Sequence, residues 1–210
     1  MKKLKLLIGF LLTINYSLLT INSFASIDMS LVAKAENYLN AITGLEGRFT
    51  QKANDRKDKG TFYMHRPGRV RLDYDTLTVQ LISNGKDLFF YDSALDQITT
   101  VPLTSTPAGI LVRKNIDLVN ADIVVSETSS KGDSFSLRIH MKEQEGVGHM
   151  VVNFAKSPVA LKSWVVVDAT GQRVEVAFDT MKTRTNFPRG FFELQRHRTT
   201  ANHGGDSFYD

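Results

Sequence analysis

Asp73 and Asp75 are the first residues whose types and spacing suggest chemistry, because two neighbouring carboxylates can act together as a general acid and a general base. They flank Tyr74 in a stretch where polar and apolar residues alternate. Successive side chains of a strand point to opposite faces, so both carboxylates are expected on the face that meets solvent. We interpret them as surface charges rather than as a catalytic pair.

Histidine, cysteine and glycine patterns offer no stronger catalytic or metal-binding motif. The sequence has no cysteine, no Gly-x-Ser-x-Gly elbow, and no upstream glycine that would make Gly85-Lys86 part of a phosphate-binding loop. Paired metal-ligand spacing is also missing among the five histidines, which are His65, His140, His149, His197 and His203. We therefore predict a protein that is not an enzyme and that needs no cofactor and no metal.

Arg66 lies where a carbonyl-binding role can be considered. It stands at the boundary between a predicted strand and the turn at Pro67-Gly68, in register with the apolar face at Met64. A guanidinium has five N–H donors, so a buried arginine can bind several carbonyl oxygens at once. The residues alone favour the simpler interpretation, a rim arginine in a surface salt bridge.

The stretch from residue 60 to residue 92 predicts a meander of strands. At a period of two, apolar residues at 62, 64, 70, 72 and 74 share one face, and Arg69, Arg71 and Asp73 share the other. Asn84-Gly85 predicts a type I′ hairpin turn. We expect further strands through Phe49 and over residues 98–103, 123–127, 135–141, 148–154, 160–168 and 173–180, with a polar loop from residue 53 to residue 59. About ten antiparallel strands of this kind tend to curl into a barrel or part-barrel.

Two helices are expected among these strands. Residues 30–42 carry an apolar stripe, with Ser30 as a possible N-cap and Thr43-Gly44 as the stop. Residues 108–113 form a short apolar helix after Thr106 at the N-cap and Pro107 at the first helical position. Either helix can cover the sheet as a lid, although an ordinary core helix is the simpler interpretation of the first.

A set of apolar residues is expected to converge on the concave side of the curled sheet. In an arbitrary all-β domain these residues would fill a core, and the residues alone favour that interpretation. The predicted helices are few and short, however, so a ligand cavity is the alternative. The set is Phe49, Phe62, Met64, Val70, Leu72, Tyr74, Leu88, Phe90, Phe154, Trp164, Val174, Val176 and Phe178 from the strands, with Ile110 and Leu111 from the second helix.

The N-terminus has the pattern of a cleaved export signal. Three lysines, at positions 2, 3 and 5, precede an apolar run over residues 6–19, and Ser23-Phe24-Ala25 fits a small-x-small cleavage site. Polar residues at 13, 15 and 17 interrupt the run, which argues against a membrane span. We predict a signal peptide over residues 1–25 cleaved near Ala25, one domain over 26–195, and a polar, disordered tail over 196–210.

The charge balance argues against nucleic-acid binding. The chain has 26 basic and 22 acidic residues, a net charge of +4; the predicted signal peptide removes three lysines and no acid, so 23 against 22 leaves +1. No run of five or more Lys/Arg occurs. The absence of cysteine rules out disulfides and a lipid anchor on an N-terminal cysteine. We expect a freely diffusing monomer.

Five short motifs, in order, resemble those of the LolA family, whose members ferry lipoproteins across the bacterial periplasm. The similarity spans roughly residues 35–178, and the absence of an N-terminal cysteine separates this chain from the acceptor lipoprotein that shares the fold class. The motifs are Arg48-Phe49-Thr50-Gln51, Arg66-Pro67-Gly68, the alternation Val70/Leu72/Tyr74, the hairpin from Asn84-Gly85-Lys86 to Phe90-Tyr91-Asp92, and Thr106-Pro107.

The resemblance implies a mainly β fold, an unclosed antiparallel β-barrel or half-barrel of about 10–11 strands covered by a helical lid. It implies that the apolar set lines a cavity for the acyl chains of lipoproteins, and that Arg66 ties the lid to the barrel. The implied compartment is the periplasm. The implied partners are acylated lipoproteins as cargo, an inner-membrane ABC-type lipoprotein-releasing complex as donor, and an outer-membrane lipoprotein as acceptor.

Two rival functions stay open at this point. One is a carrier of free lipid or glycolipid on the same fold, which would co-purify with lipid but with no acylated protein. The other is a non-enzymatic periplasmic sensor or binding module with a filled core, which would co-purify with no lipid.

Overall fold

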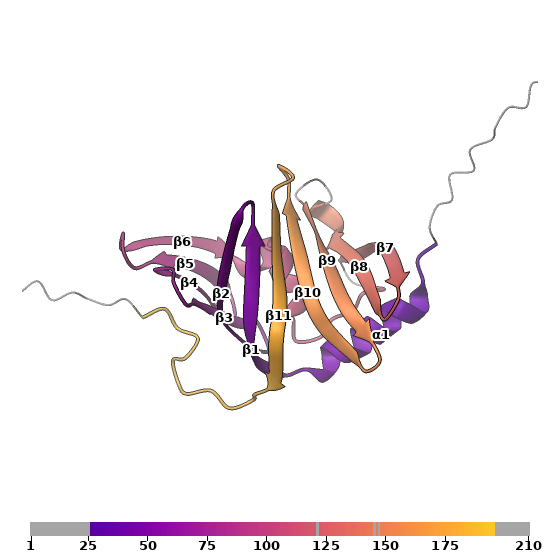
Figure 1. The fold of residues 1–210 in the computed structure, drawn as a ribbon, viewed down its shortest axis with the longest axis horizontal. Helices are drawn as coiled ribbons and strands as arrows, with labels where there is room; N and C mark the ends of the chain where they lie inside the picture. The colour runs from indigo at the N-terminus through magenta and orange to yellow at the C-terminus, as the bar shows by residue number, and fades with distance from the viewer. Residues whose placement is uncertain (1–25, 121, 145, 147, 196–210) are drawn as a thin grey trace, which may run out of the picture.

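The computed structural model describes residues 26–195, apart from positions 121, 145 and 147 (Figure 1). The predicted signal peptide (1–25) and the predicted tail (196–210) therefore lie outside the described residues. Within that part of the chain, no helix is both long and apolar enough to cross a membrane.

One open antiparallel sheet of eleven strands dominates the structure (Figure 1). Its strands lie in the order β6-β5-β4-β3-β2-β1-β11-β10-β9-β8-β7, so β1 and β11 meet in the middle and β6 and β7 form the edges. The bounds are β1 Gly44–Ala53, β2 Arg56–His65, β3 Arg69–Tyr74, β4 Val79–Asn84, β5 Asp87–Asp92, β6 Gln97–Pro102, β7 Ile123–Lys131, β8 Ser134–Met141, β9 Gly148–Lys156, β10 Val159–Asp168 and β11 Arg173–Thr183. The predicted fold class, an unclosed antiparallel half-barrel, is confirmed.

The alternation in the meander places side chains as predicted. Phe62 pairs with Leu72 and Met64 pairs with Val70 across β2 and β3, and all four side chains are buried on the concave face. The residues between them point the other way. The alternation of apolar and polar residues therefore predicted correctly which face of these strands is apolar.

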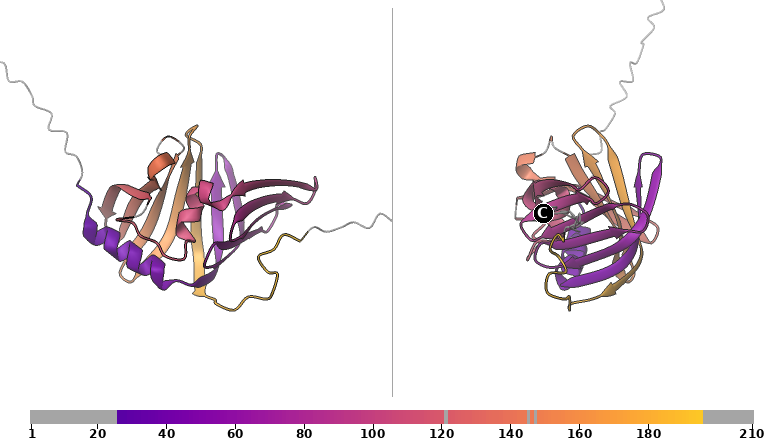
Figure 2. Two further views of the ribbon diagram at one scale, coloured as in Figure 1. Left: turned by 180° about the vertical axis from the view of Figure 1, so that it is seen from behind. Right: turned by 90° about the vertical axis from the view of Figure 1, so that its left-hand side faces the viewer.

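Two short α-helices, α1 (Met29–Ala41) and α2 (Pro107–Leu111), and two 3₁₀ helices, η1 (Leu103–Ser105) and η2 (Lys142–Gln144), complete the fold. Seen from behind in Figure 2, α1 lies across one half of the sheet and the η1–α2 segment lies near its middle. Helix α1 contacts β7, β8 and β10, and α2 contacts β9 and η1. Thr106 caps α2 as predicted, because its hydroxyl accepts a hydrogen bond from the Gly109 N–H (3.2 Å).

The cap of α1 differs from the prediction. Asp28, not Ser30, is the N-cap, since its carboxylate accepts hydrogen bonds from the Ser30 hydroxyl (2.7 Å) and the Ser30 N–H (2.9 Å). These two bonds hold the pKa of Asp28 below its usual value. Farther along, Asn40 and Glu36 bind the backbone N–H groups of Ile116 (2.9 Å) and Leu118 (2.7 Å), which ties the segment after α2 to α1.

Two predicted turns are wrong in detail. Residues 53–59 are not a loop: β1 and β2 pair as far as Ala53 and Arg56, and only Asn54 (φ 52°) and Asp55 form the turn. Both faces of this hairpin end are polar, so no alternation marked it as strand. At the second turn Asn84 is the last residue of β4, and Gly85 (φ 106°) and Lys86 make the turn. Positive φ at the first turn residue alone is the pattern of type II′, not type I′.

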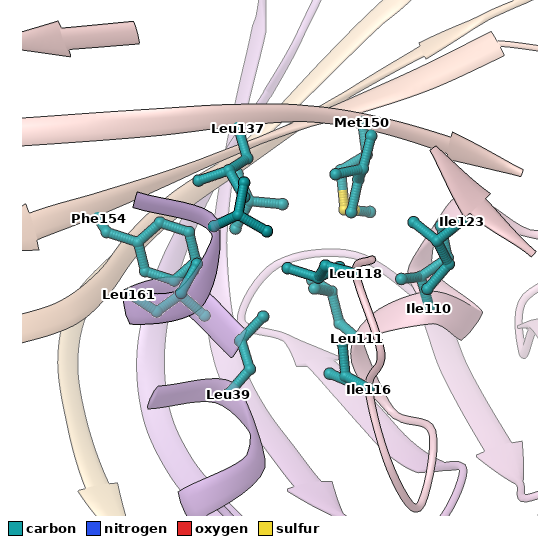
Figure 3. Close-up of a cluster of buried hydrophobic side chains, with 14 of the residues drawn as sticks. Leu39, Ile110, Leu111, Ile116, Leu118, Ile123, Leu137, Met150, Phe154 and Leu161 are labelled. Carbon is teal, nitrogen blue, oxygen red and sulfur yellow. The ribbon is translucent and has the colours of Figure 1, made fainter. Parts of the chain in front are cut away.

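The apolar concave face is divided into two cores. The first, which we call the helix-filled core, lies over β7–β10 and receives α1 through Leu31, Val32, Ala35 and Leu39. Figure 3 shows Leu39 of α1 gathered with side chains of the α2 region and of the sheet. Its remaining members are Ile110, Leu111, Ile116, Leu118, Ile123, Phe135, Leu137, Ile139, Met150, Val152, Phe154 and Leu161.

The second core, which we call the pocket core, lies over β1, β2, β3, β5 and β11 and receives no residue of α1. Leu103 and Val112, from the η1–α2 region, cover it from outside the sheet, and Ile42, just after α1, packs against it. Trp164, Phe178 and Met181 pack against both cores. The full membership is Leu45, Phe49, Phe62, Met64, Val70, Leu72, Leu88, Leu103, Val112 and Val176.

Gly60 tests how tightly the sheet side of the pocket core is packed. A Cβ at this position would lie 2.3 Å from the Asp73 carbonyl oxygen and 2.7 Å from the ring of Phe49, which is fully buried. We expect Gly60→Ala to destabilise the protein by about 1–3 kcal/mol through overpacking, measured by urea unfolding. Gly146→Ala is the control, since nothing lies within 4 Å of its Cβ. Equal stability of the two variants would contradict this packing.

Candidate ligand-binding site

An apolar pocket of about 330 Å³ lies on the concave face, over the pocket core. It is bounded by strands on one side and by the η1–α2 region on the other. Polar side-chain groups in its lining come from Gln51, Tyr74 and Thr106, and from the indole N–H of Trp164. The lining residues are Gln51, Phe62, Met64, Val70, Leu72, Tyr74, Leu81, Leu88, Phe90, Leu103, Thr106, Leu111, Val112, Trp164, Val166, Val174 and Val176.

The division of the concave face explains where the pocket lies. Over β7–β10 the side chains of α1 occupy the space between the sheet and solvent. Over β1–β5 the covering segment is short, so apolar side chains of the sheet face an unfilled volume. Such concave, mostly apolar sites with a few polar groups are typical of ligand-binding pockets.

Most of the predicted cavity residues line this pocket. The structure brings together Phe62, Met64, Val70, Leu72, Tyr74, Leu88, Phe90, Leu111, Trp164, Val174 and Val176. Phe90 is 39% exposed, so it stands at the margin of the pocket.

Four predicted cavity residues lie elsewhere. Ile110 and Phe154 are buried in the helix-filled core, Phe154 in ring contact with Phe135 and Tyr38. Phe49 is fully buried in the packing around Gly60 and meets the Tyr74 ring edge-on at 5.4 Å. Phe178 is wedged between the rings of Phe62 and Trp164. These side chains fill space beneath or beside the pocket instead of lining it.

Six lining residues were missed by the sequence analysis: Gln51, Leu81, Leu103, Thr106, Val112 and Val166. Alternation along β4 and β10 could have found Leu81 and Val166. No period marks Leu103 or Val112, because they reach the pocket from the η1–α2 segment, whose place on the sheet is a tertiary feature.

Arg66 lies where β2 ends, against α2. Its Nη2 donates a hydrogen bond to the Leu111 carbonyl oxygen (2.7 Å), while Nε and Nη1 are buried with no hydrogen-bond partner in the described part of the chain. Burial lowers the pKa of Arg66 to about 10, so the side chain stays charged at neutral pH. The next turn adds a second link to the same segment, from the Gly68 N–H to the Val112 carbonyl oxygen (2.7 Å).

The two polar groups that face each other in the pocket are those of Tyr74 and Gln51. The Tyr74 hydroxyl donates to the Gln51 side-chain oxygen (2.9 Å). Burial raises the pKa of Tyr74 to about 12. The phenol is therefore neutral throughout the physiological range.

The candidate catalytic pair behaves as surface charge. Asp73 accepts hydrogen bonds from the Arg71 Nε (2.8 and 2.9 Å), and Asp75 pairs with Arg48. The Arg48 guanidinium holds the pKa of Asp75 below its usual value. Among the residues that the structure describes, no group of three or more His, Asp or Glu side chains is placed to hold a metal ion.

The segment after β11 docks its phenylalanines on the outer face of β2. Phe187 and Phe191 contact the ring of Tyr63, and Phe192 stacks on His65. Arg184 lies over Phe187 at 4.7 Å, a cation–π contact. This cluster is on the opposite side of the sheet from the pocket.

The structure therefore combines an unclosed antiparallel sheet with an apolar pocket on its concave face, an arrangement typical of binding sites for apolar ligands. The family model described as "Outer membrane lipoprotein carrier protein LolA" matches residues 40–195. This chain belongs to the LolA family, as its motifs had indicated.

Relatives over most of the chain agree with this family. An outer-membrane lipoprotein carrier protein of Nitrosomonas europaea is 27% identical over 177 residues, covering 79% of this chain and 84% of the relative. One from Coxiella burnetii is 25% identical over 209 residues, covering 94% and 97%. The crystal structure of a LolA superfamily protein from Nitrosomonas europaea matches with a TM-score of 0.42 and 13% identity, over 81% of this chain and 99% of that one.

The raised pKa of Tyr74 predicts a loss of stability at alkaline pH. The folded-state pKa of Tyr74, about 12, lies above the ordinary value of 10. The stability that the neutral, buried phenol contributes is therefore fully present below pH 10 and is lost as pH rises toward 12. We expect the stability difference between wild type and Tyr74→Phe to shrink by roughly 1–2 kcal/mol between pH 8 and pH 11.5. Urea unfolding at both pH values measures it, and a difference independent of pH would contradict the burial of this hydroxyl.

Proposed function

We propose that this chain is a periplasmic carrier of lipoproteins, which it takes from the inner membrane to the outer membrane with their acyl chains buried in the pocket. The observation that carries the proposal is the apolar pocket itself, found in a member of the LolA family. The names of the relatives support lipoprotein as the cargo.

A carrier is needed because exposing an acyl chain to water costs much free energy. Each buried CH₂ contributes about 0.8 kcal/mol, so one acyl chain removed from water is worth roughly 10 kcal/mol. An acylated protein left exposed in an aqueous compartment would therefore aggregate or enter the nearest membrane. A carrier has to cover the chain during transit and still release it at the end.

The size of the pocket indicates that loading involves movement. Its volume of about 330 Å³ is at the lower end of the range of about 300–1,000 Å³ found for small-ligand sites. A cargo with more than one acyl chain needs more room than this. We propose that the η1–α2 segment is the cover that moves, because α2 has only five residues. Two hydrogen bonds, from Arg66 and Gly68, join it to the β2–β3 turn, and opening would break them.

Arg66 is suited to act as the latch of this cover. Apart from its bond to the Leu111 carbonyl, two buried nitrogens, Nε and Nη1, have no acceptor for their N–H groups among the described residues, and unsatisfied buried donors cost free energy. The closed arrangement is thereby less stable than a fully satisfied one. A shift of the cover that brought further carbonyl oxygens to Nε and Nη1, or freed the guanidinium to water, would lower that cost.

The proposal includes partners on both sides of the periplasm. An inner-membrane ABC-type lipoprotein-releasing complex would load the carrier, and an outer-membrane lipoprotein would accept the cargo. The carrier itself would act as a monomer. Transfer to the acceptor needs no energy source and no enzyme if the acceptor binds the acyl chains more tightly than the pocket does.

A release assay tests the proposal. The purified chain from Ser26 onward is added to spheroplasts that export a labelled outer-membrane lipoprotein. Release of that lipoprotein as a soluble one-to-one complex is the expected result. Bound phospholipid without released lipoprotein would favour the free-lipid carrier, and neither product would favour the binding module with a filled core.

Val174→Trp is expected to block the pocket in this assay. Val174 lines the pocket near the start of β11, and an indole there takes volume from the acyl chain. If the indole displaces two methylene groups of the acyl chain from the pocket, the binding free energy falls by about 1.6 kcal/mol, which lowers the affinity more than tenfold. Glu175→Trp is the matched control, because the neighbouring side chain points to the opposite face. Equal release by the two variants would remove the pocket from the mechanism.

Arg66→Leu is expected to leave a folded protein with defective cargo cycling. The variant loses the bond to Leu111 together with the two unsatisfied nitrogens, so the balance between the closed and open cover changes. We expect lipoprotein delivery to outer membranes to fall several-fold, with the far-ultraviolet circular dichroism unchanged. Arg69→Leu is the control, since Arg69 is exposed three residues away. Unaltered delivery by Arg66→Leu would show that Arg66 is not the latch.

A further inference from the structure

One hydrogen-bonded pair interrupts the apolar lining of the pocket. Gln51 comes from β1 and Tyr74 from β3, and they meet across β2, which lies between these strands. On β2, Gly60 lies opposite Tyr74 and Asp58 lies opposite Gln51, so the Tyr74 ring can cross β2 over a residue that has no side chain. Both members are only partly buried, and both are in the pocket lining.

Among the residues that the structure describes, the Gln51–Tyr74 pair lacks an acceptor for its remaining N–H donors. Thr106, another polar lining residue, is satisfied, because its hydroxyl donates to the Leu103 carbonyl oxygen (2.8 Å) and accepts from the Gly109 N–H. The Tyr74 hydroxyl donates to the Gln51 side-chain oxygen. The Gln51 side-chain NH₂ group therefore keeps two N–H donors, and no residue in the described part of the chain accepts from it. A ligand that satisfies the pair has to bring an acceptor.

The position of the pair sets a direction along the pocket. Gln51, Tyr74, Val166 and Val174 lie near the ends of their strands, by the β1–β2 and β10–β11 turns. The other end of the pocket is lined by Leu103, Leu111 and Val112 of the η1–α2 region and carries no unsatisfied polar side chain in the lining. The polar group of an amphiphile therefore fits at Gln51, and its hydrocarbon tail fits toward α2.

We infer that Gln51 is a carbonyl-binding residue, which donates a hydrogen bond to the ester or amide carbonyl of an acyl chain lying in the pocket. Tyr74 is the positioning residue, since its hydroxyl occupies the Gln51 oxygen and so turns the NH₂ group toward the ligand. This inference rests on the proposed function and adds to it that the pocket distinguishes an acyl chain from an alkyl chain of similar length.

Two probes that differ in one carbonyl group test the inference. Monopalmitoylglycerol carries an ester, and 1-O-hexadecylglycerol is the corresponding ether with the same head group. Their affinities are measured by displacement of 1-anilinonaphthalene-8-sulfonate from the full exported chain. One net hydrogen bond predicts that the ester binds about 2- to 10-fold more tightly than the ether.

Variants place the effect at Gln51. Gln51→Met keeps the length of the side chain and removes both N–H donors, so the ester and the ether are expected to bind equally. Tyr74→Phe leaves the amide free to turn, so part of the preference is expected to be lost. Asn153→Leu is the control: its amide donates to the Ser163 hydroxyl (2.9 Å) on the opposite face of the sheet, and the full preference is expected to persist.

The outcomes separate this inference from the function on which it rests. Equal binding of the two probes to the wild-type chain, or a preference that persists in Gln51→Met, would overturn the carbonyl site and leave the carrier proposal intact. Failure of both probes to bind, together with failure to release lipoprotein from spheroplasts, would overturn both.

Discussion

The structure depends on a mismatch between a wide apolar sheet and the few helical residues that cover it. Eleven strands without closure expose a long concave face, and an apolar face of that extent must be covered. Helix α1 covers the half over β7–β10, where its side chains complete an ordinary core. The half over β1–β5 is covered by the short η1–α2 segment and by Ile42, and the uncovered remainder is the pocket. A ligand with its own apolar surface would complete this half as α1 completes the other.

The same mismatch explains why the cover is suited to move. A longer helix would fill the second half permanently, as α1 fills the first. The η1–α2 segment instead is short, and it is bound at the β2–β3 turn through an arginine whose bonding is incomplete. The cost of those unsatisfied donors opposes the stability of the closed arrangement, so opening requires less free energy than the release of a satisfied latch would.

The sequence allowed the strands and their apolar face to be predicted, because alternation is a local signal: Phe62, Met64, Val70 and Leu72 lie where the period of two placed them. It did not separate the residues that line the pocket from those that fill a core. Phe154 and Phe62 have the same pattern, and only the position of α1 decides that the first is packed and the second lines a pocket. The polar Gln51 was missed as a pocket residue for a similar reason, since its role depends on Tyr74 two strands away. Such relations between distant elements are absent from local periodicity.

The most direct test of the account is to find where an acyl chain lies in the loaded carrier. A lipoprotein whose acyl chains carry a photoreactive diazirine is released from spheroplasts by this chain, irradiated, and the labelled residues are identified by mass spectrometry. The account predicts labels on the inward-facing residues of β3 and β11, such as Leu72 and Val176, and on the covering residues Leu111 and Val112. Labels confined to the outer face of the sheet, or to the helix-filled core around Phe154, would contradict it.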